Sequence, residues 1–210
     1  MILENNIVSV SGTIVSEFKF DHTVNREDFY MATVEISRLS GHVDLLPILV
    51  SERLIDVKQN YSGKIVKVIG NFRSFSQYED GKNHLVLSIF VKELEFIEAI
   101  TETSKNNLIY LDGVMCREGI YRKTPLGREI ADLLLVVKRA YGKSDCIPCI
   151  VWGRNAQFAS KLPVGSRIKA KGRIQSREYK KRLSSSEIVS RTAYEVSIWQ
   201  MEVIENADQD

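Results

Sequence analysis

The chain contains an internal repeat: four blocks of sequence occur twice, in the same order, about 101 residues apart. The matching pairs are NIVSVSG (6–12) with NLIYLDG (107–113), DLLPILV (44–50) with DCIPCIV (145–151), GKIVKVIG (63–70) with GSRIKAKG (165–172), and LEFIE (94–98) with MEVIE (201–205). A period of about 100 residues is too long for a solenoid unit and indicates two copies of one small domain. We expect an N-terminal domain over 1–100, a linker over 101–106, a C-terminal domain over 107–205 and a short acidic tail over 206–210.

Each copy is predicted to be mostly β-strand. Apolar and polar residues alternate over 8–12, and the apolar runs 132–137 and 146–152 are short and bounded by turn or charged residues. The helical candidates are brief, Glu52–Lys58 and Asn155–Leu162, and each follows the third strand of its copy. Five strands with one short helix between the third and fourth are typical of an OB barrel. We therefore predict an all-β chain of two tandem five-stranded Greek-key OB barrels. A β-sandwich of similar strand count is the alternative, which the position of the helix disfavours.

Composition and patterning exclude several classes of protein. The N-terminal stretch has no basic region and carries Glu4 within its apolar part, so we expect no signal peptide. The longest aliphatic run is Leu133–Val137, far below the roughly 20 residues that span a bilayer, so we expect no membrane partner. Three cysteines cannot form a disulfide framework, and together with the missing leader they favour the cytoplasm.

The sequence holds no catalytic constellation. It contains no phosphate-binding loop, zinc-protease motif or nucleophile elbow, so we expect neither an enzyme nor a cofactor. Cys146 and Cys149 have CxxC spacing, but strand residues three apart face opposite ways and no second pair follows. A metal site is therefore not expected.

The formal charge of +2 conceals an asymmetry between the two copies. Residues 1–105 hold 11 Lys+Arg and 15 Asp+Glu, a net −4, whereas residues 106–210 hold 18 and 12, a net +6. The second copy is therefore the candidate binder of a polyanion.

Cations in the second copy follow the period of a strand. Arg167, Lys169, Lys171 and Arg173 alternate with apolar or small residues, so all four are predicted on one strand face. Such like charges repel one another unless an anion lies against them. The aromatic residues Tyr141, Trp152 and Tyr179 fall nearby in the predicted strands and loops. Cations that neutralise phosphates, together with rings on which bases stack, are typical of single-strand nucleic-acid binding.

The same half carries a recognisable pattern. The runs RKTPLGREIA (122–131), KRAY (138–141), IVWGR (150–154), LPVGS (162–166) and KGRIQSREY (171–179) resemble bacterial single-stranded DNA-binding proteins. The resemblance covers essentially all of 106–205, and the first copy matches mainly at its Gly, Asp and Pro positions.

The resemblance implies an OB fold that binds single-stranded DNA without much sequence preference. Tyr141, Trp152 and Tyr179 fall on stacking positions, Arg122 and Arg154 fall on backbone-contacting positions, and Cys146 falls on a stacking position that is usually aromatic. The full predicted DNA-binding set is Arg122, Arg128, Lys138, Arg139, Tyr141, Lys143, Trp152, Arg154, Lys169, Lys171, Arg173, Arg177 and Tyr179.

In the first copy, Ser51, Leu45 and Gln77 stand where Trp152, Cys146 and Tyr179 stand in the second. We therefore predict a weaker N-terminal site. Its predicted residues are Arg53, Lys67, Arg73, Phe75 and Tyr78.

The resemblance also bears on assembly and role. The family usually places four OB folds in one unit, which implies a homodimer of this two-barrel chain, acting in DNA replication, recombination or repair. The family's acidic tail tip with Pro-Phe is not matched by residues 206–210, so we do not expect enzyme recruitment through the tail. The alternatives are a primosomal, phage or plasmid accessory protein, or an OB module that acts mainly through protein contacts.

Overall fold

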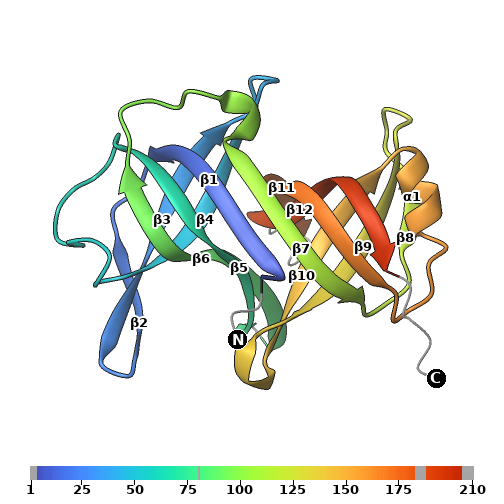
Figure 1. The fold of residues 1–210 in the computed structure, drawn as a ribbon, viewed down its shortest axis with the longest axis horizontal. Helices are drawn as coiled ribbons and strands as arrows, with labels where there is room; N and C mark the ends of the chain where they lie inside the picture. The colour runs from blue at the N-terminus through green and yellow to red at the C-terminus, as the bar shows by residue number, and fades with distance from the viewer. Residues whose placement is uncertain (1–3, 80, 183–187, 205–210) are drawn as a thin grey trace.

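The computed structural model describes residues 4–79, 81–182 and 188–204, and it consists of two similar barrels side by side (Figure 1). The strands of the N-terminal half are β1 (Asn6–Ile14), β2 (Lys19–Val24), β3 (Glu27–Ser37), β4 (Val43–Ser51), β5 (Ile65–Glu79) and β6 (Lys82–Phe96). A 3-10 turn, η1 (Thr103–Lys105), leads into the C-terminal half. Its elements are β7 (Asn107–Met115), β8 (Ile120–Lys123), β9 (Glu129–Lys138), η2 (Ala140–Gly142), β10 (Ser144–Trp152), α1 (Arg154–Ala159), β11 (Arg167–Arg182) and β12 (Ile188–Ile204).

Both barrels close in the same way. In the N-terminal half β1 pairs with both β3 and β5, β5 pairs with β6, and β6 runs parallel to β4. In the C-terminal half β7, β9, β11, β12 and β10 repeat these pairings. The predicted all-β architecture of two tandem OB barrels is confirmed. Each half has six strands rather than five, because β2 and β8 pair only with β3 and β9 as short hairpin strands.

The predicted helix of the first copy is wrong. Residues 52–58 form turns, whereas α1 in the second copy lies within the predicted Asn155–Leu162 region apart from its first residue. Polar side chains in the turn segment bind nearby backbone amides: Arg53 N donates to Ser51 Oγ (3.1 Å) and Lys58 N donates to Asp56 Oδ1 (3.2 Å). The first bond is compatible with the start of a helix, but the second occupies an amide that a helix would bond to the carbonyl four residues earlier, so it competes with the helix.

The two barrels are joined by strand pairing. Antiparallel pairing of β1 with β7, with Val8 opposite Ile109, merges both halves into one sheet (Figure 1). At its centre, the order β6-β5-β1-β7-β11-β12 forms one six-stranded face. Alternation sends Val8 and Ile109 into the barrel cores, where both are buried, and leaves their neighbours on the outer face.

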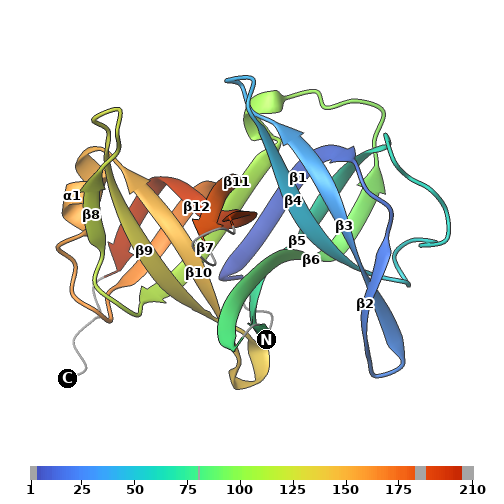
Figure 2. The same ribbon diagram turned by 180° about the vertical axis from the view of Figure 1, so that it is seen from behind.

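A second contact between the halves comes from the long hairpins. Seen from behind, β5 of the N-terminal half reaches the turn between β9 and β10 of the other barrel (Figure 2). By the internal repeat, β11 reaches the start of β4 in the same way. Each barrel is thus in contact with a hairpin of its neighbour.

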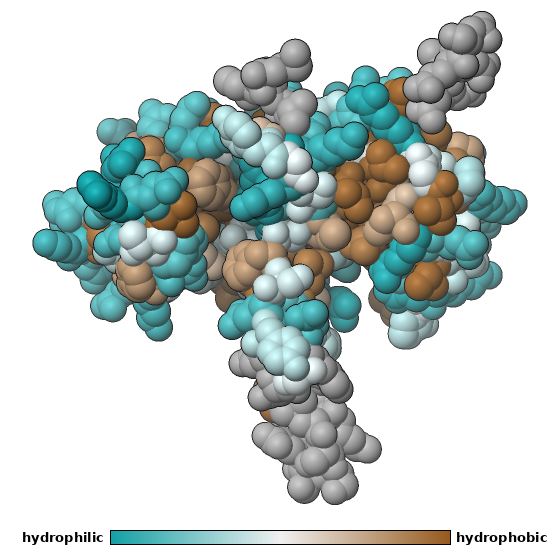
Figure 3. All heavy atoms as spheres, turned by 90° about the horizontal axis from the view of Figure 1, so that it is seen from below, coloured by the Kyte–Doolittle hydropathy of each residue, from teal (hydrophilic) through white to brown (hydrophobic). Residues whose placement is uncertain are grey.

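The surface is mostly hydrophilic, with apolar patches. Seen from below, the broadest apolar patch lies on the C-terminal half (Figure 3). Among the residues that the structure describes, no helix has the length and apolar character needed to cross a membrane.

Candidate nucleic-acid interface

A groove of about 1050 Å³ lies between the two halves. Four of the predicted DNA-binding residues line it: Arg128, Trp152, Arg173 and Arg177. The C-terminal half also contributes Trp199, and the N-terminal half contributes Arg38, Leu39, Ser40 and His42. The sequence has only two tryptophans, and both lie in this groove. Cations and aromatic rings in one concave surface suit a single-stranded polyanion.

β11 places its cations in two different environments. Ile168, Ala170, Gly172 and Ile174 are buried, which confirms the predicted alternation. The first three cations nevertheless lie on the six-stranded face, where Arg167 bonds Asp112 (2.8 Å) and Lys169 and Lys171 pair with β7. Arg173 lies past the end of the β7 pairing and lines the groove. The predicted cationic face is therefore divided between the outer sheet and the groove.

A β-bulge turns Trp199 toward the groove. Lys171 pairs with Gln200 and Gly172 pairs with Ile198, so Trp199 has no partner in the β11–β12 register. An unpaired bulge residue redirects its side chain, and Trp199 is 52 % exposed. The equivalent bulge in β6 falls on Lys92, between the pairs Ile69–Glu93 and Gly70–Val91. The two halves thus share the bulge but not the aromatic ring.

Two predicted aromatic residues are held by neighbouring polar groups. Trp152 is half-buried and its indole Nε1 donates to Ser197 Oγ (3.0 Å). Tyr179 is partly exposed on β11, with the Arg177 guanidinium carbon 5.9 Å from its ring centroid. A cation over a ring face is a weak attraction at exposed sites. The hydrogen bond therefore orients the Trp152 ring before any ligand arrives, whereas Tyr179 is held only weakly.

The predicted residues at the edge of the C-terminal barrel lie on its surface. Arg122 on β8 forms a bidentate ion pair with Asp132 (2.6 and 3.1 Å), which raises the pKa of the arginine through that hydrogen bond. Arg128 and Arg154 are exposed, and Arg154 is the first residue of α1.

The turn between β9 and β10 lies outside the groove, since none of residues 139–143 lines it. Tyr141 is fully exposed with a left-handed backbone (φ 61°), and Lys138 and Lys143 are exposed beside it. Arg139 lies between the halves instead of pointing to solvent, because it binds a buried carboxylate.

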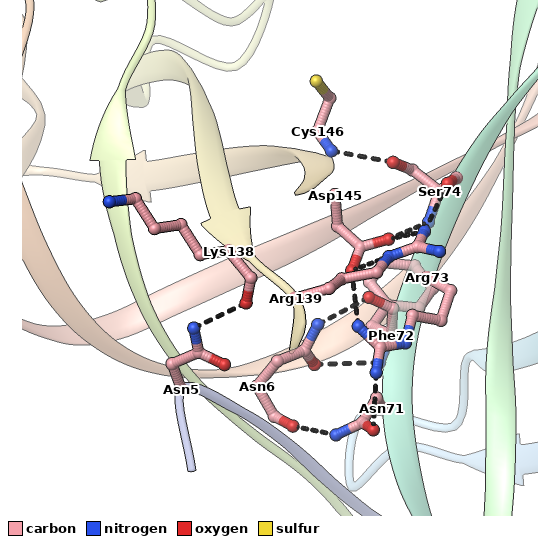
Figure 4. Close-up of polar contacts among 10 residues, drawn as sticks. All are labelled: Asn5, Asn6, Asn71, Phe72, Arg73, Ser74, Lys138, Arg139, Asp145 and Cys146. Atoms are coloured by element: carbon pink, nitrogen blue, oxygen red, sulfur yellow. Dashed lines mark hydrogen bonds and ion pairs between the residues drawn. The ribbon is translucent and has the colours of Figure 1, made fainter. Parts of the chain in front are cut away.

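That carboxylate, Asp145, is at the centre of a polar network between the barrels (Figure 4). Asp145 is fully buried and accepts hydrogen bonds from Arg139 Nε (2.8 Å), Arg73 Nη1 (2.8 Å) and the Ser74 backbone amide (2.6 Å). The Cys146 amide donates to Ser74 Oγ (2.7 Å) beside it. Two predicted DNA-binding cations, Arg73 and Arg139, are therefore occupied by one buried acid.

The repeat builds a sparser version of this network on the groove side. Buried Asp44 accepts from Arg38 Nε (2.6 Å) and from the Ser176 amide (2.8 Å), and the Leu45 amide donates to Ser176 Oγ (3.0 Å). Hydrogen bonding to Asp44 raises the pKa of Arg38, although burial opposes this effect. In place of Arg73, the C-terminal half has Gln175, which donates to Glu195 Oε1 (2.7 Å).

The predicted N-terminal site is dispersed. Arg53 pairs with Glu27 (3.3 Å), Lys67 is exposed on the six-stranded face, and Arg73 binds Asp145. Phe75 and Tyr78 are exposed along β5. These five residues do not form one groove.

Cysteine chemistry is limited by burial. Burial raises the pKa of the Cys149 thiol well above its ordinary value, so this thiol stays neutral. Within the described ranges, no cluster of three or more His, Cys, Asp or Glu side chains could hold a metal ion.

Three groups were missed from the sequence, and two of them had a signal. Trp199 follows Ile198 directly, which breaks the alternation of a strand and is typical of a bulge. The repeated acids Asp44 and Asp145 begin otherwise apolar strands, where a charge needs a specific partner. Arg38 had no local signal, because the groove that it lines belongs to the other half.

Comparison with known proteins finds one matching family model and similar solved structures. Residues 106–204 match the model of the "Single-strand binding protein family". A crystal structure of the wild-type single-stranded DNA binding protein from Thermus aquaticus is 17 % identical, with a TM-score of 0.76 over 98 % of this chain and 95 % of that one. A deletion variant of that protein is also 17 % identical, with a TM-score of 0.74 over 98 % and 97 %. At this identity the likeness concerns the fold. Among curated proteins, none matches the chain.

Proposed function

We propose that the chain binds single-stranded DNA largely without sequence preference, because its residues 106–204 match the model of the single-strand binding protein family. Members of this family are DNA-binding proteins rather than enzymes, and roles in replication, recombination and repair are typical of them. The observation that carries the proposal is the groove, in which two tryptophans face a set of arginines. Stacking on a ring accepts any base, and a phosphate contact is the same at every nucleotide.

We expect poly(dT) to quench the intrinsic tryptophan fluorescence of the chain, because both tryptophans lie in the groove. The affinity should fall steeply with salt, with a log–log slope of about −0.7 for each phosphate contacted. A fluorescence titration at several salt concentrations measures both effects. Absence of quenching together with absence of a salt slope would contradict the proposal and favour an OB module that acts through protein contacts.

The same titration tests whether the two halves contribute unequally to DNA affinity. Tyr179→Ala should weaken binding by about 1–3 kcal/mol if the ring stacks a base. Tyr78→Ala, which removes an exposed ring one residue beyond the position equivalent to Tyr179, should cost much less, because neither tryptophan of the groove belongs to its barrel. Equal losses of affinity in the two variants would show that the two halves contribute equally. Tighter binding of duplex than of single-stranded DNA would count against the whole proposal.

A homodimer that presents four barrels is the proposed assembly, and the six-stranded face supports it. A sheet with one face on a core normally has polar residues on the other. Here the residues directed away from the cores include Ile7 (40 % exposed), Ile69, Leu108 and Tyr110 around the β1–β7 seam. A second copy can cover this apolar centre by two-fold symmetry. In that arrangement Lys67, Lys169 and Lys171 would contact the other copy instead of DNA.

We expect the chain to sediment at twice its 23.9 kDa mass, and the variant Leu108→Glu to sediment as a monomer. The added carboxylates would face each other across the two-fold axis, where burial without a partner is costly. Sedimentation velocity over a range of concentrations measures the mass. A monomeric wild type, or a variant that stays dimeric, would exclude this face as the interface.

A further inference from the structure

The N-terminal half forms one wall of the groove in the C-terminal half. The wall is the segment between β3 and β4, residues 38–42, of which Arg38, Leu39, Ser40 and His42 line the groove. This segment is fixed in place because the Asp44 carboxylate and the Leu45 amide, which follow it, bond to Ser176 of β11. The wall is therefore positioned by the same strand that carries Arg173.

Arg38 presents a cation to the groove in a defined orientation. Its Nε and Nη2 both bond to the buried Asp44 carboxylate, and 18 % of its side chain is exposed. Within the described part of the chain, its Nη1 has no hydrogen-bond partner. A guanidinium fixed on one edge by a carboxylate can still donate from its other edge to an acceptor such as a phosphate oxygen.

Arg173 of β11 lines the same groove. Its Nε is buried and, among the described residues, makes no hydrogen bond. Burial and the nearby charge of Arg38 lower the pKa of Arg173, and Asp44 only partly offsets this. Buried donors are almost always satisfied in native proteins, so an exception calls for an acceptor from outside.

The equivalent positions of the N-terminal half lack these features. Asn71 stands where Arg173 stands, and its amide Nδ2 bonds the Asn6 carbonyl. Lys92 stands where Trp199 stands, and Ser51 where Trp152 stands. Among the residues that the structure describes, the unsatisfied arginine and the exposed ring occur together only in the groove of the C-terminal half.

We propose that this groove is a composite nucleotide site, in which Arg38 from the N-terminal half and Arg173 from the C-terminal half hold one phosphodiester while Trp199 stacks the attached base. The proposal rests on single-stranded DNA binding as the function of the chain. It assigns the N-terminal half a direct share in the site of its neighbour, through residues outside the predicted N-terminal set. The phosphate supplies the acceptor that the buried Nε lacks and screens the repulsion between the two arginines.

The variant Arg173→Met tests the phosphate contact. We expect the affinity for poly(dT) to fall about tenfold, because a hydrogen bond to a charged group is lost, and the salt slope to become shallower by about 0.7. The melting temperature should stay the same or rise, since a half-buried charge with an unsatisfied Nε is removed. The control Lys161→Met removes one exposed charge outside the groove and should leave the affinity and the slope nearly unchanged.

A bulky maleimide adduct on Ser40→Cys tests the N-terminal wall, in a Cys116→Ser background that removes the exposed thiol. We expect the adduct to weaken binding at least as much as Arg173→Met, whereas the same adduct on Lys161→Cys should have little effect. Wild-type affinity in both Arg173→Met and the residue 40 adduct would overturn the composite site while single-strand binding stands. Failure of the wild-type chain to bind poly(dT) would refute the proposed function and this site together.

Discussion

Replacing Asp145 by alanine is expected to lower the free energy of unfolding by about 3–5 kcal/mol, the largest loss we predict for a single polar side chain. The carboxylate is fully buried and holds Arg73, Arg139 and the Ser74 amide. Its removal leaves two arginines, each about a quarter exposed, without their counter-charge between the barrels. Urea denaturation at one fixed protein concentration measures the loss.

Two matched variants define what is special about Asp145. Asp44→Ala removes the equivalent acid, which holds one arginine and one amide, and should cost less. Asp132→Ala breaks the exposed Arg122 pair and should cost about 1 kcal/mol or less. If Asp145→Ala costs no more than Asp132→Ala, the buried network does not hold the two halves together.

The variant Gly172→Ala is expected to destabilise the chain by about 3 kcal/mol and to weaken poly(dT) binding as well. A Cβ at Gly172 would lie 2.5 Å from the Ser197 carbonyl oxygen of β12, a backbone atom that cannot move without shifting the strand. Such a shift displaces the bulge that turns Trp199 toward the groove. Chemical denaturation and the fluorescence titration measure the two effects.

Gly70→Ala is the matched control for the functional part of this prediction. Its Cβ would lie 2.2 Å from the Phe90 carbonyl oxygen, so the loss of stability should be at least as large. The adjoining bulge carries Lys92 rather than a tryptophan, and DNA binding by the folded fraction should change little. A similar loss of affinity in both glycine variants would show that the bulge around Trp199 has no particular role.

Sequence patterns predicted the elements whose causes are local. The alternation around Ile168, Ala170 and Ile174 is a property of one strand, and the structure buries all three. The helix over Glu52–Lys58 failed for an equally local reason, because Asp56 binds the Lys58 amide, which a helix would need.

The parts that could not be predicted depend on contacts between the halves. Arg139 is of a residue type that is common in DNA sites. It instead donates to the carbonyl of Ser74, which lies 65 residues away in the sequence. Arg38 belongs to the acidic half, yet its segment lines a groove in the basic half. Whether a cation is free to contact DNA or is held in an ion pair depends on how one barrel packs on the other. The sequence of a single strand does not contain that information.

Pairing of β1 with β7 within one polypeptide makes the association of the two barrels independent of dilution. A pair of separate barrels would dissociate at low concentration, whereas a short connection keeps the partner at a high effective concentration. Along this edge an N-terminal barrel always pairs with a C-terminal barrel and never with a second N-terminal barrel. Under that arrangement one barrel can lose the aromatic residues at the positions of Trp152 and Tyr179 and gain acidic residues while its neighbour keeps both rings. This is the divergence that the two halves display.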